Sequence, residues 1–222
     1  MSITQNIVQL KKSLPEQVTL VAVSKFHPTE ALQEAYDAGQ RVFGESRAQE
    51  LCAKQKVLPN DIEWHFIGPL QTNKVKDIAP FIHLIHSIDS LKLLKEVNKQ
   101  GKKHNRIIRV LLEIHVAQEE TKHGLSPEEC KELLSDESFK ELHNVTICGL
   151  MGMATNTEDP VQIQNEFHKI HELFIELKNT LCNDNPDFKE ISMGMSHDYP
   201  LAIKEGSTLI RVGTSIFGER EY

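Results

Sequence analysis

One lysine stands at a position that suits covalent chemistry. Lys25 follows the apolar segment VTLVAVS at residues 18–24 and precedes Pro28 and a segment of helical period. A partly buried lysine amine at such a boundary has a lowered pKa and attacks carbonyl groups to form a Schiff base. A solvated loop lysine is the alternative, and most lysines are of that kind. Position alone therefore makes Lys25 a candidate nucleophile without naming its substrate.

Two turns later in the chain pair a glycine with a hydroxyl residue. Gly194 comes two residues before Ser196, and Gly213 directly precedes Thr214. Each turn follows an apolar segment and leads into a segment of helical period, so its N–H groups and hydroxyl are placed to donate to an anion. One such turn would be read as an ordinary helix cap. Two of them favour a phosphate-binding site.

Arg211 ends the last apolar segment, two residues before Gly213. A buried arginine needs a partner, which is either a structural carboxylate or a ligand such as the ring nitrogen of a cofactor. A lysine, a phosphate site and an arginine together suit pyridoxal phosphate (PLP), which offers an aldehyde, a phosphate and a pyridine nitrogen. A Schiff-base aldolase acting on a sugar phosphate would use similar parts, so both chemistries remain open.

Other polar residues give weaker indications. Glu113 and His115 alternate along one apolar segment and so face the same side of a strand, as a polar layer or an acid–base pair. His168 and His171 share a helix face, where solvated histidines are far commoner than metal ligands. We predict no metal site. The cysteines are widely spaced and fit free thiols in a reducing compartment: Cys52, Cys130, Cys148 and Cys182.

The elements that carry these residues alternate regularly. Short apolar segments are expected as strands at 18–24, 41–44, 62–68, 81–87, 106–116, 145–150, 190–193 and 208–212, each followed by a helical segment. Eight such units in about 200 residues favour a single (β/α)8 TIM barrel, with an extra N-terminal helix near residues 4–13. A doubly wound open sheet is the alternative. In a barrel, the carboxyl ends of the strands would bring Lys25, Arg211 and both glycine turns to one face.

Local patterns predict several helix boundaries. Ser126 and Glu129 have the spacing of a capping box, and Asp159 followed by Pro160 predicts a helix start. Gly101 is expected to end the helix that begins at Ser90. The helix after Pro160 is expected to bury an apolar stripe at positions 161, 167, 170, 174, 177 and 181.

The composition excludes several classes of protein. The 222 residues include 25 Lys+Arg and 32 Asp+Glu, for a formal net charge of −7, and no linker interrupts them. We expect one domain over residues 1–222, with no nucleic-acid partner because the basic footprint is missing. No apolar run approaches the roughly 18 residues of a membrane span, and the start lacks the pattern of a signal peptide. We therefore expect a cytoplasmic protein.

Several segments, in order along nearly the whole chain, carry a family resemblance. The sequence resembles the pyridoxal phosphate homeostasis proteins, single-domain relatives of the N-terminal barrel of bacterial alanine racemase. HFIGPLQ combined with SMGMS and RVGT is a specific set. The matching segments are LVAVSKFHP (20–28), AGQRVFGES (38–46), EWHFIGPLQTNK (63–74), ETKHG (120–124), GLMGM (149–153), SMGMSHDYPLAIKEGST (192–208) and RVGTSIFGER (211–220).

The resemblance implies a site. PLP would form a Schiff base with Lys25, and Arg211 would meet the pyridine nitrogen. The phosphate would be held by Ser196, Gly213 and Thr214, and further contacts would come from Met195, Met151, His65 and Ser46. Two positions depart from the family pattern: Ser46 replaces the asparagine of FGEN, and His115 stands where relatives commonly have asparagine.

The resemblance also implies a function. It is intracellular PLP homeostasis without an established catalytic turnover, with apo PLP-dependent enzymes as recipients. We expect a monomer, because the sequence offers no second domain with which to build the racemase-type dimer. A weak PLP-dependent amino-acid racemase is the alternative. Two-base racemisation needs an acid or base on the opposite face of the ring, which in alanine racemase is a tyrosine from a second domain of the partner subunit. An arginine at the pyridine nitrogen would also keep it unprotonated and make the ring a poorer electron sink.

Overall fold

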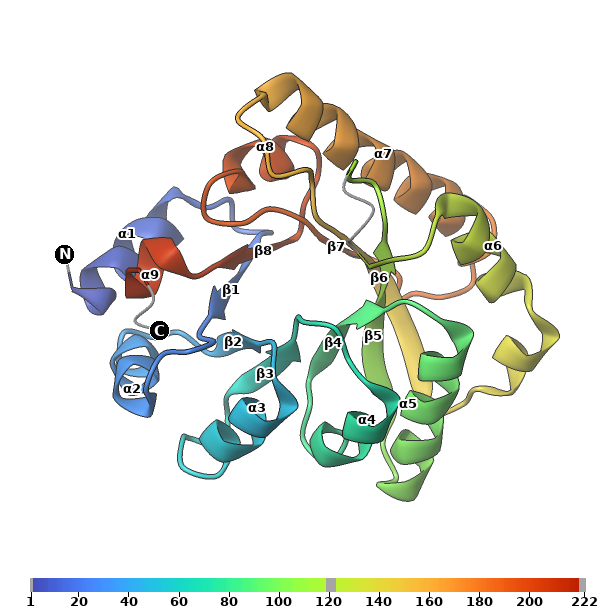
Figure 1. Ribbon diagram of the computed structural model, residues 1–222, viewed down its shortest axis with the longest axis horizontal. Helices are drawn as coiled ribbons and strands as arrows, with labels where there is room; N and C mark the ends of the chain where they lie inside the picture. The colour runs from blue at the N-terminus through green and yellow to red at the C-terminus, as the bar shows by residue number, and fades with distance from the viewer. Residues whose placement is uncertain (1, 119–122, 220–222) are drawn as a thin grey trace.

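Eight parallel strands close into a barrel, and helices surround it (Figure 1). The computed structural model describes residues 2–118 and 123–219, so most of the ETKHG segment and the last residue of RVGTSIFGER lie outside the described residues. The strands are β1 (Thr19–Val23), β2 (Val42–Glu45), β3 (Glu63–Phe66), β4 (Leu84–Ile88), β5 (Ile108–Ile114), β6 (Val145–Gly152), β7 (Glu190–Ser192) and β8 (Leu209–Val212). Each strand pairs with the next, and β8 pairs with β1, which confirms the predicted (β/α)8 barrel.

The helices follow the strands in alternation. They are α1 (Ile3–Ser13), α2 (Thr29–Asp37), α3 (Ala48–Gln55), α4 (Thr72–Ile78), α5 (Leu91–Lys103), α6 (Pro127–Ser135), the 3₁₀ helix η1 (Glu137–Glu141), α7 (Pro160–Asn179), α8 (Tyr199–Lys204) and α9 (Thr214–Phe217). The predicted extra helix is α1. It packs beside α9, where the Asn6 side chain donates to the Ile216 carbonyl at 3.0 Å, so the two ends of the described chain meet (Figure 1).

The predicted helix starts are confirmed. At α6, Ser126 accepts from the Glu129 N–H, and the Glu129 side chain accepts from the Ser126 N–H in return. At α7, Asp159 accepts from the backbone of the first turn, and Pro160 is the first helical residue. These caps satisfy N–H groups that have no partner within their own helix.

The prediction that Gly101 ends a helix is wrong. Helix α5 continues through it to Lys103. A Cβ at position 101 would lie 2.5 Å from the Asn144 carbonyl oxygen and 3.0 Å from that of Arg106. The glycine is therefore needed because other backbone approaches the helix closely, and that approach is a tertiary feature.

The predicted apolar stripe of α7 is correct in its middle and wrong at both ends. Val161 is 65% exposed and Leu181 is 46% exposed. Val161 lies in the first turn, and Leu181 follows the helix end at Asn179. The face that packs on the barrel instead comprises Ile163, Glu166, Phe167, Ile170, Leu173, Phe174 and Leu177.

The core has two parts. A large apolar layer lies between the strands and the helices, as expected when strands are covered on the outside. A second, small cluster fills part of the barrel interior with Val21, Leu84, Leu111, Cys148, Met151 and Leu209. Buried polar side chains, described below, occupy other interior positions.

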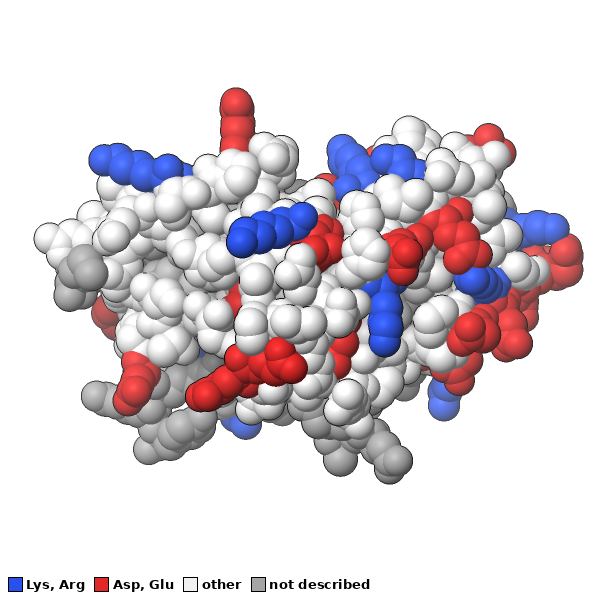
Figure 2. All heavy atoms as spheres, turned by 90° about the horizontal axis from the view of Figure 1, so that it is seen from above, with Lys and Arg blue, Asp and Glu red and all other residues white. Residues whose placement is uncertain are grey.

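The surface carries both signs of charge. On the face shown in Figure 2, acidic and basic side chains are interspersed, and the basic ones do not merge into a single patch. Among the described residues, no helix combines the length and the apolar composition that a membrane span requires.

Candidate functional site

A cavity of about 230 Å³ opens at the carboxyl ends of the strands. This is the end at which barrel enzymes place their active sites. Its lining brings together six residues that the sequence singled out: Lys25, Met195, Ser196, Arg211, Gly213 and Thr214. The other lining residues are Val23, Ile67, Met153 and His197. The strand ends thus supply an amine, a guanidinium and two hydroxyls around one space.

The two glycine turns form one side of the cavity. The Gly213 N–H donates to Ser196 Oγ at 3.3 Å, which joins the turn after β8 to the turn after β7. Gly194 has φ +90°, and a Cβ there would lie 2.7 Å from the Cβ of Ala202. A side chain at this position would strain the backbone and clash, so the turn requires glycine. Hydroxyls and backbone N–H groups in this arrangement suit a phosphate group.

The segment carrying Lys25 is held by its neighbours. Lys25 is half-buried, two residues after the end of β1. The Phe26 N–H donates to Glu50 Oε1 at 2.7 Å, and Lys54 Nζ donates to the Ser24 carbonyl at 2.8 Å. Phe26 has φ +68°, a left-handed conformation that is rare for a bulky residue. Helix α3, which contributes Glu50 and Lys54, therefore fixes a strained backbone on both sides of the lysine.

A buried ion-pair cluster supports this segment from outside the barrel. Lys54 Nζ lies 2.7 Å from both Glu45 Oε1 and Glu50 Oε1, and Ser24 Oγ donates to Glu45 Oε1 at 2.7 Å. Burial raises the pKa of Glu45, while the charge and hydrogen bond of Lys54 oppose that shift. The role of Lys54 was not predictable from the sequence, because a lysine inside an amphipathic helix normally lies on its solvated face.

Arg211 is buried, and its position is fixed by three hydrogen bonds. One terminal nitrogen donates to the Ser192 carbonyl at 2.9 Å and to Ser192 Oγ at 2.6 Å, and the other donates to the Gly152 carbonyl at 3.0 Å. Burial lowers its pKa to about 10, against the opposing effect of the Asp198 and Glu113 carboxylates. Arg211 therefore stays charged at neutral pH and reaches the cavity as a pure hydrogen-bond donor.

Three residues named from the family resemblance lie away from the cavity lining. Met151 is packed in the barrel interior beside Leu111, and Met153, two residues further along the chain, reaches the cavity instead. His65 lies in the interior with Nδ1 2.9 Å from His86 Nε2. Ser46 lines a separate groove with Lys74.

Two histidines of the site, His197 and His86, were not predicted from the sequence. His197, within the SMGMSHD segment, lines the cavity with Nε2 3.3 Å from Asp198 Oδ2. Its place directly after Ser196 was the available signal. His86, in contrast, gave none, because one histidine in a buried strand is usually a structural residue. Glu113 is buried, as expected for a polar layer, and burial raises its pKa. His115 does not share that layer, because it follows the end of β5 and lines a groove beside α6 and α7.

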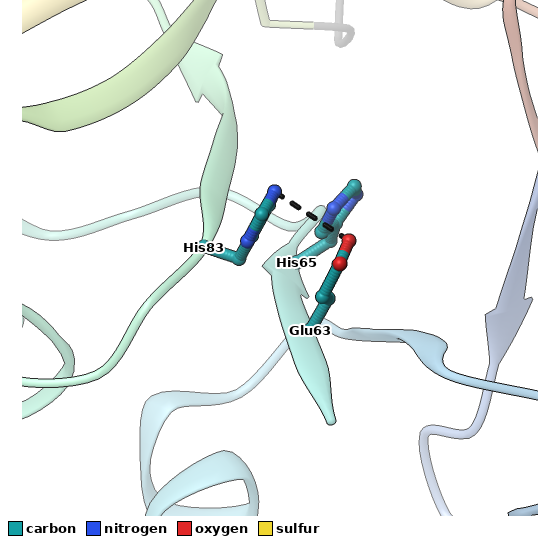
Figure 3. A group of neighbouring side chains, drawn as sticks. All are labelled: Glu63, His65 and His83. Carbon is teal, nitrogen blue, oxygen red and sulfur yellow. Dashed lines mark ion pairs between the residues drawn. The ribbon is translucent and has the colours of Figure 1, made fainter. Parts of the chain in front are cut away.

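A polar cluster at the amino end of the barrel has residue types that can ligate a metal. Glu63, His65 and His83 each offer one ligand atom, all within 4.8 Å of one another, and Figure 3 shows their side chains projecting side by side. The planes of the two histidine rings differ by only 12°, so their nitrogen lone pairs do not converge on one point. Arg109 also donates to His83 Nε2 at 3.2 Å, which puts a positive charge where a cation would bind. This geometry does not favour a metal.

Comparison with known sequences gives consistent matches. The chain matches the family model of the alanine racemase N-terminal domain over residues 1–221. It is 45% identical to the pyridoxal phosphate homeostasis protein of Aquifex aeolicus, over 91% of this chain and 87% of that protein. It is 37% identical to the protein of the same name from Escherichia coli, over 94% of this chain and 88% of that protein.

Solved structures agree with the sequence matches. PipY of Synechococcus elongatus, with PLP bound, matches at a TM-score of 0.86 and 37% identity, covering 98% of this chain and all of that one (100%). Alanine racemase of Bartonella henselae matches at a TM-score of 0.71 and 19% identity, covering 98% of this chain and 59% of the racemase, which shows a shared fold. By the extent and identity of these matches, the chain belongs to the pyridoxal phosphate homeostasis protein family, whose barrel is that of the alanine racemase N-terminal domain.

Proposed function

We propose that this protein binds PLP through a Schiff base on Lys25 and takes part in intracellular PLP homeostasis without catalytic turnover. One observation carries the proposal. Lys25, Arg211 and the hydroxyls of Ser196 and Thr214 line the same cavity at the carboxyl ends of the strands. The PLP bound to PipY, a relative of 37% identity, supports the choice of ligand.

The donor set of the cavity suits PLP group by group. The Gly213 N–H and the two hydroxyls would hold the phosphate, and Met195 would pack against the ring. Arg211 has only donors, so it would pair with an unprotonated pyridine nitrogen. PLP supplies a reactive aldehyde and, when its ring nitrogen is protonated, an electron sink. Pairing with Arg211 would leave that sink weak, which fits a binding protein better than an enzyme.

Lys25 would hold the aldehyde reversibly. Its amine adds to the aldehyde carbon, and the loss of one water leaves a C=N bond, so hydrolysis regenerates both groups. The segment held by Glu50 and Lys54 would keep the amine at the cavity. A protein of this kind would withhold a toxic aldehyde and still release it to apo PLP-dependent enzymes. With free thiols at its cysteines, the cytoplasm is its proposed compartment.

The visible absorption spectrum tests the attachment. PLP added to the purified protein should produce a yellow band, and borohydride reduction should fix the PLP mass on the peptide that contains residue 25. The Lys25→Ala variant should show neither the yellow band nor the added PLP mass. The Lys56→Ala variant, which lacks an exposed lysine after α3, should show both. A wild-type protein without the band, even in excess PLP, would refute the proposal and favour the aldolase chemistry.

The proposed lack of turnover has its own support and test. The hydroxyl of Tyr36 donates to Asp61 at 2.7 Å, and neither Tyr36 nor Tyr199 lines the cavity, so neither described tyrosine is placed as the second base. Solvent deuterium should not enter the Cα position of any amino acid in a panel incubated with the PLP-loaded protein. Exchange that is lost in His197→Ala would instead support the weak racemase, since His197 lines the cavity.

Delivery to recipients can be separated from storage. PLP loaded on the wild-type protein should reach an apo PLP-dependent enzyme faster than PLP released by simple dissociation, as measured with a scavenger in place of the enzyme. Equal rates with enzyme and scavenger would leave a PLP reservoir and contradict direct transfer.

A further inference from the structure

A chain of buried polar side chains runs through the barrel interior behind Arg211. Ser192 Oγ lies 2.6 Å from the Arg211 guanidinium and 2.9 Å from His86 Nδ1, and His86 Nε2 lies 2.9 Å from His65 Nδ1. These side chains come from β8, β7, β4 and β3 and are all buried. The chain thus leads from the cavity toward the amino end of the barrel, where Glu63 and His83 lie beside His65 (Figure 3).

Hydrogen-bond chemistry fixes the direction of this chain. A guanidinium can only donate, so Ser192 Oγ accepts from Arg211. The serine proton then has His86 Nδ1 as its only hydrogen-bond acceptor among the described residues, and a serine that donates to this atom requires it to be unprotonated. Neutral His86 consequently carries its proton on Nε2 and donates to His65 Nδ1. His65 in turn carries its proton on Nε2, a buried atom without a hydrogen-bond partner among the described residues.

The surroundings keep both histidines neutral, as this direction requires. Burial sets the pKa of His86 and of His65 well below the ordinary histidine value. The charge of Arg211 acts in the same sense on His86, and those of His83 and Arg109 on His65. The carboxylates of Glu113 on β5 and Asp198 before α8 face Arg211. Of these three buried side chains, Arg211 therefore carries the positive charge, and His86 and His65 stay neutral.

We propose that Ser192 and His86 are positioning residues that hold the Arg211 guanidinium toward the cavity, and that His65 sets the tautomer of His86. The hydrogen bond from Ser192 to His86 turns a lone pair of the serine oxygen toward Arg211. Together with the Ser192 and Gly152 carbonyls, it fixes the plane of the guanidinium and thus the direction of its remaining N–H groups. The consequence for PLP rests on the proposed function, whereas the hydrogen-bond chain itself does not.

The tautomers can be measured on the PLP-free protein. Long-range ¹H–¹⁵N correlation spectra of histidine-labelled protein should show His86 and His65 protonated on Nε2 and bare on Nδ1. His86→Asn and His65→Asn assign the signals by their loss. A proton on Nδ1 of His86 would overturn the inference, because the serine could not then donate to it. This result does not depend on whether PLP binds.

Two substitutions of His86 test its hydrogen bond to Ser192 and its hydrogen bond to His65 separately. Asparagine places an amide oxygen near the Nδ1 position and can still accept from Ser192, whereas glutamine places its amide near Nε2 and can reach only His65. His86→Asn should bind PLP within about threefold of the wild type, and His86→Gln at least about tenfold more weakly, the equivalent of one lost hydrogen bond. The absorption band of bound PLP should shift in the glutamine variant alone. His143→Asn, at an exposed site, is the control.

The outcomes separate the two proposals. Equal weakening by both substitutions, with unshifted bands, would show that His86 acts only in packing and would overturn the positioning role. A wild-type protein that binds no PLP would refute the proposed function, and the tautomers would still decide the hydrogen-bond chain. If His86→Gln does not fold, Ser192→Ala replaces it and should weaken PLP binding by a similar factor, since it removes the acceptor for Arg211. Unchanged binding by Ser192→Ala would overturn the positioning role.

Discussion

Single side chains decide what the cavity can bind. Its polar groups can all donate hydrogen bonds: an amine, a guanidinium, two hydroxyls, an imidazole, and a backbone N–H that here bonds Ser196 Oγ. Such a set suits a ligand that is rich in acceptors, such as PLP with its phosphate at the two glycine turns, as proposed. Removing the two hydroxyls one at a time therefore tests whether each of them binds the ligand.

Removing a hydroxyl from the proposed phosphate site should weaken PLP retention. Ser196→Ala and Thr214→Ala each remove one charge-assisted hydrogen bond, worth about 1.5–3 kcal/mol, so the Kd for PLP should rise by about 10- to 150-fold. Equilibrium dialysis measures this directly. Ser215→Ala is the matched control, because Ser215 is exposed and absent from the lining. Unchanged Kd values in both hydroxyl variants would contradict the site.

The buried histidines make stability depend on pH. A lowered pKa in the folded state means that the unfolded chain binds more protons below about pH 6.5, the ordinary histidine value. Above that pH, neutral His86 makes its full contribution to the free energy of unfolding. As the pH falls toward the folded-state pKa of His86, the free energy of unfolding decreases by about 1.4 kcal/mol per pH unit. Urea unfolding at pH 7, 6 and 5 should give a shallower decline for His86→Asn than for the wild type. Parallel declines would show that His86 is protonated in the folded protein.

At the scale of elements, the short helix α3 determines where Lys25 stands. It carries Glu50, which accepts a hydrogen bond from the Phe26 N–H, and Lys54, which donates one to the Ser24 carbonyl. Strand β2 adds Glu45, which shares the Lys54 ammonium. The strained Phe26 conformation persists because these contacts offset it.

Lys54→Met should therefore destabilise the protein and disturb the site. It leaves Glu45 and Glu50 without their cation, and breaking a buried pair in this way costs about 3–5 kcal/mol. The expected result is a lower midpoint in urea unfolding and slower formation of the borohydride-trapped product on Lys25. Lys56→Met removes an exposed lysine nearby and should change neither. A Lys54→Met protein as stable as the wild type would show that the ammonium contributes little net free energy.

At the scale of the whole molecule, a closed barrel leaves no open sheet edge for pairing with another chain. The large apolar side chains exposed among the described residues are few, and they lie on α1, after α3, before β5, and on or just after α7: Val8, Val57, Ile107, Val161, Ile175 and Leu181. Single exposed apolar residues of this kind do not form an interface.

We accordingly expect a monomer. Size-exclusion chromatography with light scattering should give the chain mass of 25.3 kDa, with and without PLP. Twice that mass at micromolar concentration would contradict this expectation. PLP at about 100 times its Kd should also stabilise the folded state by about 2.7 kcal/mol, visible as a rise in Tm.

Local sequence patterns were sufficient to predict the alternation of eight strands and helices, the capped starts of α6 and α7, and the residues at the strand ends. Hydrophobic periodicity, helix caps and glycine turns each depend on residues close together in the sequence, so they can be recognised before the fold is known. The folded arrangement was needed to explain why position 101 is a glycine, which residues at the two ends of α7 are exposed, and how Lys54 and His86 support the site. Those features depend on contacts between segments far apart in the chain, such as Gly101 with Asn144 and His86 with Ser192. A pattern along one segment carries no information about its partner across the barrel.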